Sequence, residues 1–221
     1  MNEQAAVVIG ASGLIGNFVV QSLLKDEAFK TVRILIRKKI NIIHPKLQQQ
    51  IVDFNDINDY MEKLGFGDVI FCCIGTTQKK VKGDKNLYEK IDFDIPVNAA
   101  RIGIENKFKQ FLIVSAIGAN EDSSNFYLKL KGKTENTLKQ FSFQSISIFR
   151  PSVLLGNRKE IRPGEKIMQV IMKLISFLLI GSLKKYRAID ASKVAKAMVN
   201  QSKKNESGIH ILDYTEMMKL Q

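Results

Sequence analysis

The hydrophobic residues of this chain fall into short runs that alternate with longer segments of helical spacing. The runs are rich in β-branched residues and occupy residues 5–10, 31–37, 49–54, 68–75, 109–118 and 143–150. Between them, apolar residues recur at helical intervals over residues 14–24, 88–104 and 126–138. Near-continuous apolar runs are typical of parallel strands that helices cover on both faces. The pattern therefore predicts an α/β fold with a doubly wound parallel sheet.

The first strand runs directly into a glycine-rich loop and then into a helix. In VVIGASGLIG this loop carries Gly10, Ser12, Gly13 and Gly16, so that the glycines are spaced Gly-x-x-Gly-x-x-Gly. Glycines allow a tight turn, let backbone N–H groups approach a pyrophosphate, and let the helix pack close to the strand. The positive end of the helix dipole then faces the phosphates. The loop predicts a dinucleotide site in a Rossmann-type fold, and a purely structural turn is the alternative.

The end of the second strand indicates which dinucleotide is bound. Arg37, Lys38 and Lys39 stand where an NAD-binding site would present an acidic residue to the ribose hydroxyls. Arginine cannot accept hydrogen bonds from those hydroxyls, but it pairs well with a 2′-phosphate. The segment therefore predicts NADP(H), unless it is a solvated basic turn.

The third and fourth strands also end in residues that suit a cofactor. Asp53 could accept the adenine amino group, or it could cap the helix that begins near Asn55. Gly75 and Thr76 follow the fourth strand, where the chain must pass close to the cofactor ribose and nicotinamide. Ligands of such sheets lie beyond the carboxyl ends of the strands, so we expect these residues at one site.

The fifth strand and the next helix carry a candidate catalytic set. Ser115 ends the strand, and Tyr127 opens the helix that continues through Lys131. Residues four apart share a helix face, and a nearby ammonium group favours a phenolate. Tyr127 could then move a proton to or from a substrate oxygen while hydride passes between substrate carbon and nicotinamide. Ser115 would hydrogen-bond that oxygen, and Lys131 would also hold the nicotinamide ribose.

Each of these three residues also has a plain structural explanation. The serine could satisfy backbone groups at a strand end, the tyrosine could be an aromatic residue at the edge of the core, and the lysine is one of many. The catalytic interpretation depends on their occurrence together, downstream of a glycine loop and on the expected strand and helix.

The last third of the chain is less regular. An apolar run from Leu174 to Leu183 lies between Lys173 and Lys184, and it is shorter than the roughly 20 residues that cross a bilayer. We expect a helix over the substrate mouth or on a partner in a homodimer, with an interfacial membrane contact as the alternative. Residues 1–221 are expected to form a single NAD(P)-binding domain, in which residues 151–188 are a small substrate lip.

The net charge of +12 widens the range of partners. A basic surface permits a nucleic acid or an anionic membrane, but the lysines form no long block and no nucleic-acid-binding motif is present. We expect a generally basic surface that suits an anionic cofactor and an anionic small-molecule substrate.

The remaining bulk features are ordinary. Cys72 and Cys73 are adjacent, which suits neither a metal site nor a loop-closing disulfide. The first residues contain no basic leader and no long apolar run, so we expect a cytoplasmic protein without a transmembrane segment.

Several longer stretches resemble the short-chain dehydrogenase/reductase superfamily, in its atypical and extended branches. GASGLIG, FCCIGTTQKK, SSNFYLKLKGKTE and IFRPSVLLGNRKEIRPGE are similar to the HIV Tat-interactive protein family and its bacterial relatives, which are described as NAD(P)-binding oxidoreductases or sugar-epimerase-like proteins. The resemblance covers about residues 5–200 and implies a Rossmann fold with NADPH in the cleft. It implies Ser115, Tyr127 and Lys131 as catalytic residues, and cofactor contacts from Gly10, Ser12, Gly13, Leu14, Ile15, Arg37, Ile74, Gly75, Thr76, Pro151 and Val153.

One departure concerns the substrate. Extended members act on nucleotide sugars through a sizeable C-terminal domain, whereas residues 151–221 are all that follow the sixth strand here. Arg158 and Arg162 could hold an anionic group at the substrate lip, or they could be surface arginines of a loop.

Three functions follow from these observations. The first is an NADP(H)-dependent oxidoreductase that acts on a carbonyl or an alcohol, with Tyr127 as acid and base. The second is a non-catalytic NADPH-binding regulatory or sensor protein. The third is a binder of nucleic acid or membrane surfaces that acts through charge.

Overall fold

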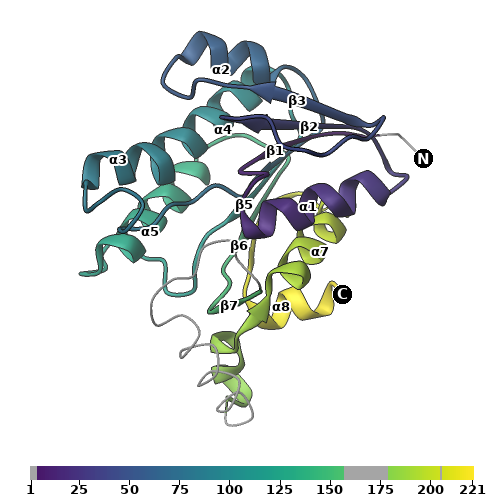
Figure 1. The fold of residues 1–221 in the computed structure, drawn as a ribbon. Helices are drawn as coiled ribbons and strands as arrows, with labels where there is room; N and C mark the ends of the chain where they lie inside the picture. The colour runs from purple at the N-terminus through teal and green to yellow at the C-terminus, as the bar shows by residue number, and fades with distance from the viewer. Residues whose placement is uncertain (1–3, 157–178, 205) are drawn as a thin grey trace.

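The computed structural model describes residues 4–156, 179–204 and 206–221 (Figure 1). Within these residues, seven strands form one sheet in which every neighbouring pair is parallel. They are β1 (Gln4–Ile9), β2 (Phe29–Ile36), β3 (Leu47–Ile51), β4 (Val69–Cys72), β5 (Gln110–Val114), β6 (Ser145–Phe149) and β9 (Gly208–Leu212). Their order across the sheet is β3-β2-β1-β4-β5-β6-β9, and β7 (Leu154–Leu155) pairs separately with β8 (Ile189–Asp190).

Helices connect most of the strands. They are α1 (Leu14–Lys25), α2 (Ile57–Leu64), α3 (Lys85–Glu89), α4 (Ile95–Glu105), α5 (Phe126–Leu138), α7 (Ala191–Ser202) and α8 (Tyr214–Lys219). A π-helical turn, η1 (Lys90–Asp94), joins α3 to α4, and a 3₁₀ helix, η2 (Gly181–Tyr186), precedes β8.

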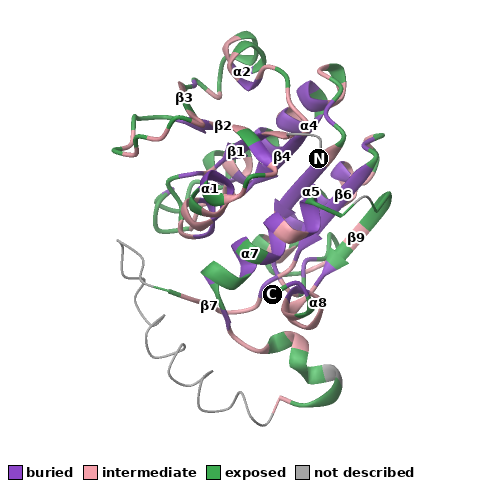
Figure 2. Ribbon diagram, turned by 90° about the vertical axis from the view of Figure 1, so that its right-hand side faces the viewer, coloured by how far each residue is buried: buried purple, intermediate pink, exposed green. Residues whose placement is uncertain are grey.

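The sheet separates two hydrophobic cores, because successive side chains of a strand point to opposite faces. On β1, Val8 packs with α1, α7 and α8 on one face, and Val7 packs with α2, α4 and α5 on the other. The central strands are buried along their length (Figure 2). This three-layer, doubly wound arrangement confirms the predicted Rossmann-type fold.

Helix α5 is placed by its start and by one close contact. Its N-cap residue Asn125 accepts a hydrogen bond from the Leu128 N–H at 3.1 Å. At Gly132, a Cβ atom would lie 2.3 Å from the carbonyl carbon of Asn120, so the helix packs against this loop more closely than any side chain would allow. Both features define the position of the helix face that carries Tyr127 and Lys131.

All six predicted strands are present, whereas β9 and the helices α7 and α8 were not anticipated. Arg158, Arg162 and the first half of the apolar run from Leu174 to Leu183 (residues 174–178) lie outside the described residues, and its last residues enter the 3₁₀ helix η2. Among the residues that the structure describes, no helix is both long and apolar enough to cross a membrane.

Candidate functional site

The glycine loop after β1 packs directly against the end of β4. Gly10 has a φ of +84°, and a Cβ atom there would lie 2.7 Å from the Cys73 carbonyl group and from the Ile74 nitrogen. At Gly16, a Cβ atom would lie 2.2 Å from the Gly10 oxygen, and the Gly13 N–H donates to that oxygen at 2.9 Å. The loop therefore has no room for side chains at Gly10 and Gly16, and it holds the ends of the two central strands together.

The start of α1 offers backbone donors. Its N-cap residue is Gly13, which provides no side-chain cap. Ser12 and Gly13 are exposed, while Ile15 is buried and Leu14 lies beside Gly156. A helix of this length begins with N–H groups that have no partner within the helix. The loop and helix start therefore fit the pyrophosphate of a dinucleotide.

The ends of β2 and β3 lie beside this loop. Ile9 is paired with Leu35, and Ile36 with Ile51, so Arg37, Lys38 and Asp53 follow at the same carboxyl edge of the sheet. Arg37 and Lys38 are exposed.

Asp53 does not cap the helix. The carboxylate of Asp53 accepts hydrogen bonds from Asn55 N and Nδ2, both at 2.9 Å, and these bonds lower its pKa. The cap of α2 is Asp56, whose side chain accepts from two N–H groups of the first turn. The alternative role considered for Asp53 is therefore wrong, because the helix begins later than the sequence suggested.

Lys131 is buried and forms an ion pair with Asp92 of η1. Its Nζ lies 3.0 Å from Asp92 Oδ1, and the two side chains are 6% and 1% exposed. The other oxygen, Oδ2, accepts the Thr76 N–H at 2.8 Å. A Cβ atom at Gly75 would lie 3.5 Å from Oδ1 and 3.9 Å from Nζ. Asp92 thus ties the loop after β4 to the α5 lysine, at the point where a nicotinamide ribose would lie.

The charge on Lys131 depends on its neighbours. Loss of hydration on burial favours the neutral amine, whereas the carboxylate of Asp92, and next the phenolate form of Tyr127, favour the ammonium ion. The net effect raises the pKa of Lys131 above its ordinary value. Tyr127 lies one helical turn away in the first turn of α5, and its side chain is 37% exposed. A partly exposed phenol beside a buried cation suits proton exchange with a bound molecule.

Ser115 lies immediately after β5, and its N–H donates to the Phe149 carbonyl oxygen at 2.7 Å. Its hydroxyl group donates to Glu135 Oε1 at 2.5 Å. Glu135 is 1% exposed and is also held by Arg150, whose Nε donates to Oε1 at 3.0 Å and whose Nη2 pairs with Oε2. The serine is therefore part of a buried network that the sequence did not reveal.

The structure brings several of the predicted site residues close together. Gly10 lies against Ile74, Gly75 lies beside Lys131, and Thr76 is bonded to the carboxylate that pairs with Lys131. Pro151 accepts the Ile117 N–H at 3.0 Å and so lies beside the segment after Ser115, whereas Val153 accepts the Ile189 N–H of β8 at 3.0 Å.

Three residues of the site were not anticipated: Asp92, Glu135 and Arg150. For Glu135 a signal existed, because its spacing from Tyr127 and Lys131 continues the same helix face. Asp92 and Arg150 carry no comparable signal, since a charged residue beside an apolar segment ordinarily indicates a solvated position.

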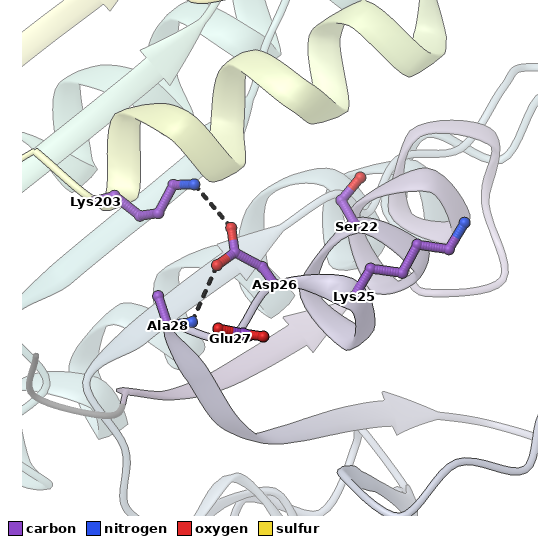
Figure 3. Close-up of a pocket in the computed structure, with 6 residues that line it drawn as sticks. All are labelled: Ser22, Lys25, Asp26, Glu27, Ala28 and Lys203. Atoms are coloured by element: carbon purple, nitrogen blue, oxygen red, sulfur yellow. Dashed lines mark hydrogen bonds and ion pairs between the residues drawn. The ribbon is translucent and has the colours of Figure 1, made fainter.

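A separate surface depression lies at the opposite edge of the sheet (Figure 3). It is lined by Ser22, Lys25, Asp26, Glu27, Ala28 and Lys203. Lys203 Nζ donates to Asp26 Oδ2 at 2.7 Å, and the Ala28 N–H donates to Oδ1 at 3.0 Å. Because this turn joins the end of α1 to the start of β2, the depression belongs to the amino edge, away from the carboxyl ends where ligands of such sheets bind.

Comparison with known proteins agrees with this geometry. A family model described as NAD(P)H-binding matches residues 10–204. The chain belongs to this NAD(P)H-binding family. Protein HTATIP2 of Rattus norvegicus is 33% identical over 168 residues, which are 75% of this chain and 69% of that protein. Protein FMP52, mitochondrial, of Candida albicans is 30% identical over 206 residues, which are 91% of this chain and 89% of that protein.

The two relatives confirm the resemblance to the HIV Tat-interactive protein family and to the atypical short-chain dehydrogenases/reductases. Solved structures share the fold of this NAD(P)H-binding chain. MoeE5 in complex with UDP-glucuronic acid and NAD has a TM-score of 0.72 at 15% identity, covering 94% of this chain and 75% of that one. ADP-L-glycero-D-manno-heptose-6-epimerase from Helicobacter pylori has a TM-score of 0.70 at 16% identity, covering 99% and 80%. At these identities the likeness concerns the fold alone.

Proposed function

We propose that this chain is an NADP(H)-dependent oxidoreductase that interconverts a carbonyl and an alcohol, with Tyr127 as acid and base. The observation that carries the proposal is the position of Lys131. Its ammonium group is buried against the loop after β4, close to Gly75, and one helical turn from a partly exposed phenol. A cation at this place can hold a ribose and act on the tyrosine together.

The chain's own residues have distinct tasks in this reaction. The bound nicotinamide cofactor supplies hydride chemistry. Backbone N–H groups of Leu14 and Ile15, at the start of α1, would hold the pyrophosphate, and Lys131 would hold the nicotinamide ribose. In reduction, for which the cofactor would supply hydride, Tyr127 would give its proton to the carbonyl oxygen. In oxidation, the phenolate takes the alcohol proton, so electrons and protons balance in both directions.

Preference for the phosphorylated cofactor is supported by Arg37 and Lys38. Both are exposed immediately after β2, at the carboxyl edge and beside the glycine loop. A guanidinium group binds a phosphate through parallel hydrogen bonds, whereas it offers no acceptor to the ribose hydroxyls of NAD.

A titration of NADPH against NADH tests the cofactor. We expect the wild type to bind NADPH more tightly and Arg37→Asp to reverse that preference, because the new carboxylate accepts the ribose hydroxyls and repels a phosphate. Lys25→Asp makes the same reversal of charge at the opposite edge of the sheet, in the last turn of α1, and should leave the preference unreversed. Equal affinity of the wild type for both cofactors would contradict the choice of NADPH.

A second measurement tests the tyrosine. We expect Tyr127→Phe to lower kcat by about 10²- to 10⁴-fold, the usual contribution of a positioned acid or base, with unchanged affinity for NADPH. Turnover that persists undiminished in this variant would exclude Tyr127 as the proton donor.

A non-catalytic NADPH-binding regulatory protein is the second candidate. One observation favours it: Lys131 and Ser115, the two expected partners of Tyr127, are already engaged by the carboxylates of Asp92 and Glu135. A panel of carbonyl compounds separates the two functions. Tight NADPH binding without NADPH consumption would favour the sensor, and consumption that Tyr127→Phe abolishes would favour the enzyme. A cytoplasmic location stays a prediction, since the fungal relatives are named as mitochondrial.

A further inference from the structure

The hydroxyl group of Ser115 is bonded to a carboxylate deep inside the protein. Ser115 is 5% exposed and Glu135 is 1% exposed, and their oxygens are 2.5 Å apart. Arg150 grips the same carboxylate, with its Nε on Oε1 at 3.0 Å and its Nη2 on Oε2. This two-point contact matches the fork of a guanidinium group to an ionised carboxylate.

The direction of the serine hydrogen bond follows from the chemistry of these groups. An ionised carboxylate accepts hydrogen bonds and has no proton to give, and a guanidinium group only donates. The proton between the two oxygens is therefore that of Ser115. A hydroxyl group has one proton and two lone pairs, so Ser115 can present only lone pairs to a molecule in the cleft while this bond is intact.

Two elements fix the network in place. Glu135 continues the α5 face that carries Tyr127 and Lys131, one helical turn beyond the lysine. On the opposite side, the Ser115 N–H is bonded to Phe149 of β6, and the N–H of the adjacent Arg150 is bonded to the Leu212 oxygen of β9. The serine is thus held between the helix and two strands. If its hydroxyl proton turned toward the substrate, a buried carboxylate oxygen would lose this donor, which lowers the stability of the protein.

We propose that Glu135 and Arg150 are positioning residues that hold Ser115 as a hydrogen-bond acceptor toward the cleft. The orientation of the hydroxyl group does not depend on the proposed function, but its consequence for the substrate rests on it. With Tyr127 protonated, an alcohol accepts a hydrogen bond from the phenol and donates its own proton to Ser115. A carbonyl oxygen accepts from Tyr127 and finds no donor at Ser115. The site is therefore built to retain the alcohol form.

Proton NMR of the wild type tests the orientation directly. A short hydrogen bond from a hydroxyl to a carboxylate, buried as this one is, should give a low-field hydroxyl resonance that exchanges slowly with water. The resonance should vanish in Ser115→Ala and in Glu135→Leu, which leaves no oxygen to accept from the serine. It should persist in Ser115→Thr, which keeps a hydroxyl group, and in Ser147→Ala, which removes another buried serine from β6. Absence of the resonance in the wild type, or its persistence in Glu135→Leu, would overturn the proposal.

A mutant cycle in urea unfolding supplies a second readout that needs neither cofactor nor turnover. A hydrogen bond to a charged group corresponds to about a 10- to 100-fold change in the unfolding constant. Ser115→Ala should cause such a change in the wild type and much less in Glu135→Leu, where the bond is already lost. Ser147→Ala should act equally in both backgrounds. Equal effects of Ser115→Ala in both backgrounds would argue against the bond.

Kinetics then connect the network to the substrate. In Glu135→Leu, no side-chain oxygen is left to accept from Ser115, which frees the serine proton for the substrate. We expect this variant to lower KM for the carbonyl compound by roughly two- to tenfold, the size of one hydrogen bond, and a purely structural role predicts no such gain. If the wild type reduces no carbonyl compound, the proposed function fails, and the resonance and the mutant cycle still decide the orientation of Ser115.

Discussion

Replacement of Asp92 by asparagine removes one charge from the buried ion pair with Lys131 and leaves the shape nearly unchanged. The asparagine oxygen can still accept the Thr76 N–H, so the loop after β4 keeps its anchor. Both side chains are less than a tenth exposed, and solvent therefore screens the loss weakly. Breaking such a pair by removing one partner costs about 3–5 kcal/mol. We expect a loss of this size in the free energy of unfolding at pH 7.

The pH dependence of this loss follows from the remaining lysine. Without Asp92, the strongest charge interaction that favours the ammonium ion is gone, and burial then lowers the pKa of Lys131. Lys131 can then lose its proton when the variant folds. With an unfolded pKa near 10.4 and about 1.36 kcal/mol per pH unit, the loss of this proton limits the destabilisation to about 4.6 kcal/mol at pH 7 and about 1.9 kcal/mol at pH 9. The unfolded variant then binds one more proton than the folded variant, so its stability rises with pH.

The wild type should behave differently over the same range. Its folded pKa for Lys131 is raised above the unfolded value, so the contribution of the pair is fully present below about pH 10 and is lost only as the pH rises through the folded pKa. Urea unfolding at pH 7, 8 and 9 should therefore show a difference in the free energy of unfolding between wild type and Asp92→Asn that becomes smaller as the pH rises.

An exposed pair between α5 and the end of α3 serves as the matched control. Glu89 and Lys133 are paired at 2.6 Å, but their side chains are 40% and 49% exposed. Glu89→Gln should therefore cost about 0–1 kcal/mol, with no change between pH 7 and pH 9. If Asp92→Asn lowers the free energy of unfolding by less than about 1 kcal/mol at every pH, Lys131 is not a buried cation that depends on this carboxylate.

Three further outcomes are expected. Gly10→Ala should abolish NADPH binding, because its Cβ would meet main-chain atoms at 2.7 Å. In urea unfolding it should lower the free energy of unfolding by well over the roughly 1–2 kcal/mol of left-handed backbone strain. Gly83→Ala (φ +81°) has open space around it and should cost this strain alone. Burial raises the pKa of Cys72 to about 12, so native protein at pH 8 should resist iodoacetamide at this thiol and unfolded protein should react; fast labelling of the native thiol would contradict its burial. Asn125→Ala removes the α5 cap and should lower the free energy of unfolding by about 0.5–2 kcal/mol, and an unchanged urea midpoint would show that the cap contributes nothing.

Much of the fold could be predicted from the sequence because its central strands are covered on both faces. Strands β1, β2, β4, β5 and β6 consist largely of apolar residues, and this pattern survives without knowledge of the tertiary contacts. Helix α5 was predicted with its observed ends, Phe126 and Leu138. Asn125 and the helical spacing of apolar residues provide local signals for such a helix.

The elements that were missed lack such local signals. Strand β9 is an edge strand whose Ile209 and Ile211 remain about half exposed, so its sequence has neither a long apolar run nor clean alternation. Asp92 looks like an ordinary charged position of a solvated helix, and the face that Glu135 shares with Tyr127 and Lys131 does not show which groups Glu135 holds. Their roles arise from partners distant in sequence, Lys131 for one and Ser115 with Arg150 for the other, and no spacing rule brings these groups together.

The two cations nearest the expected reaction centre, Lys131 and Arg150, are each balanced by a carboxylate of the interior. They consequently contribute little to the long-range electrostatic attraction of an anionic cofactor. That attraction would come from uncompensated surface groups such as Arg37 and Lys38 at the far end of the crevice. Under the proposed function, separate groups of charges would therefore attract the nucleotide and assist the movement of the proton. A protein engineer could retune cofactor choice at one end without disturbing acid–base chemistry at the other.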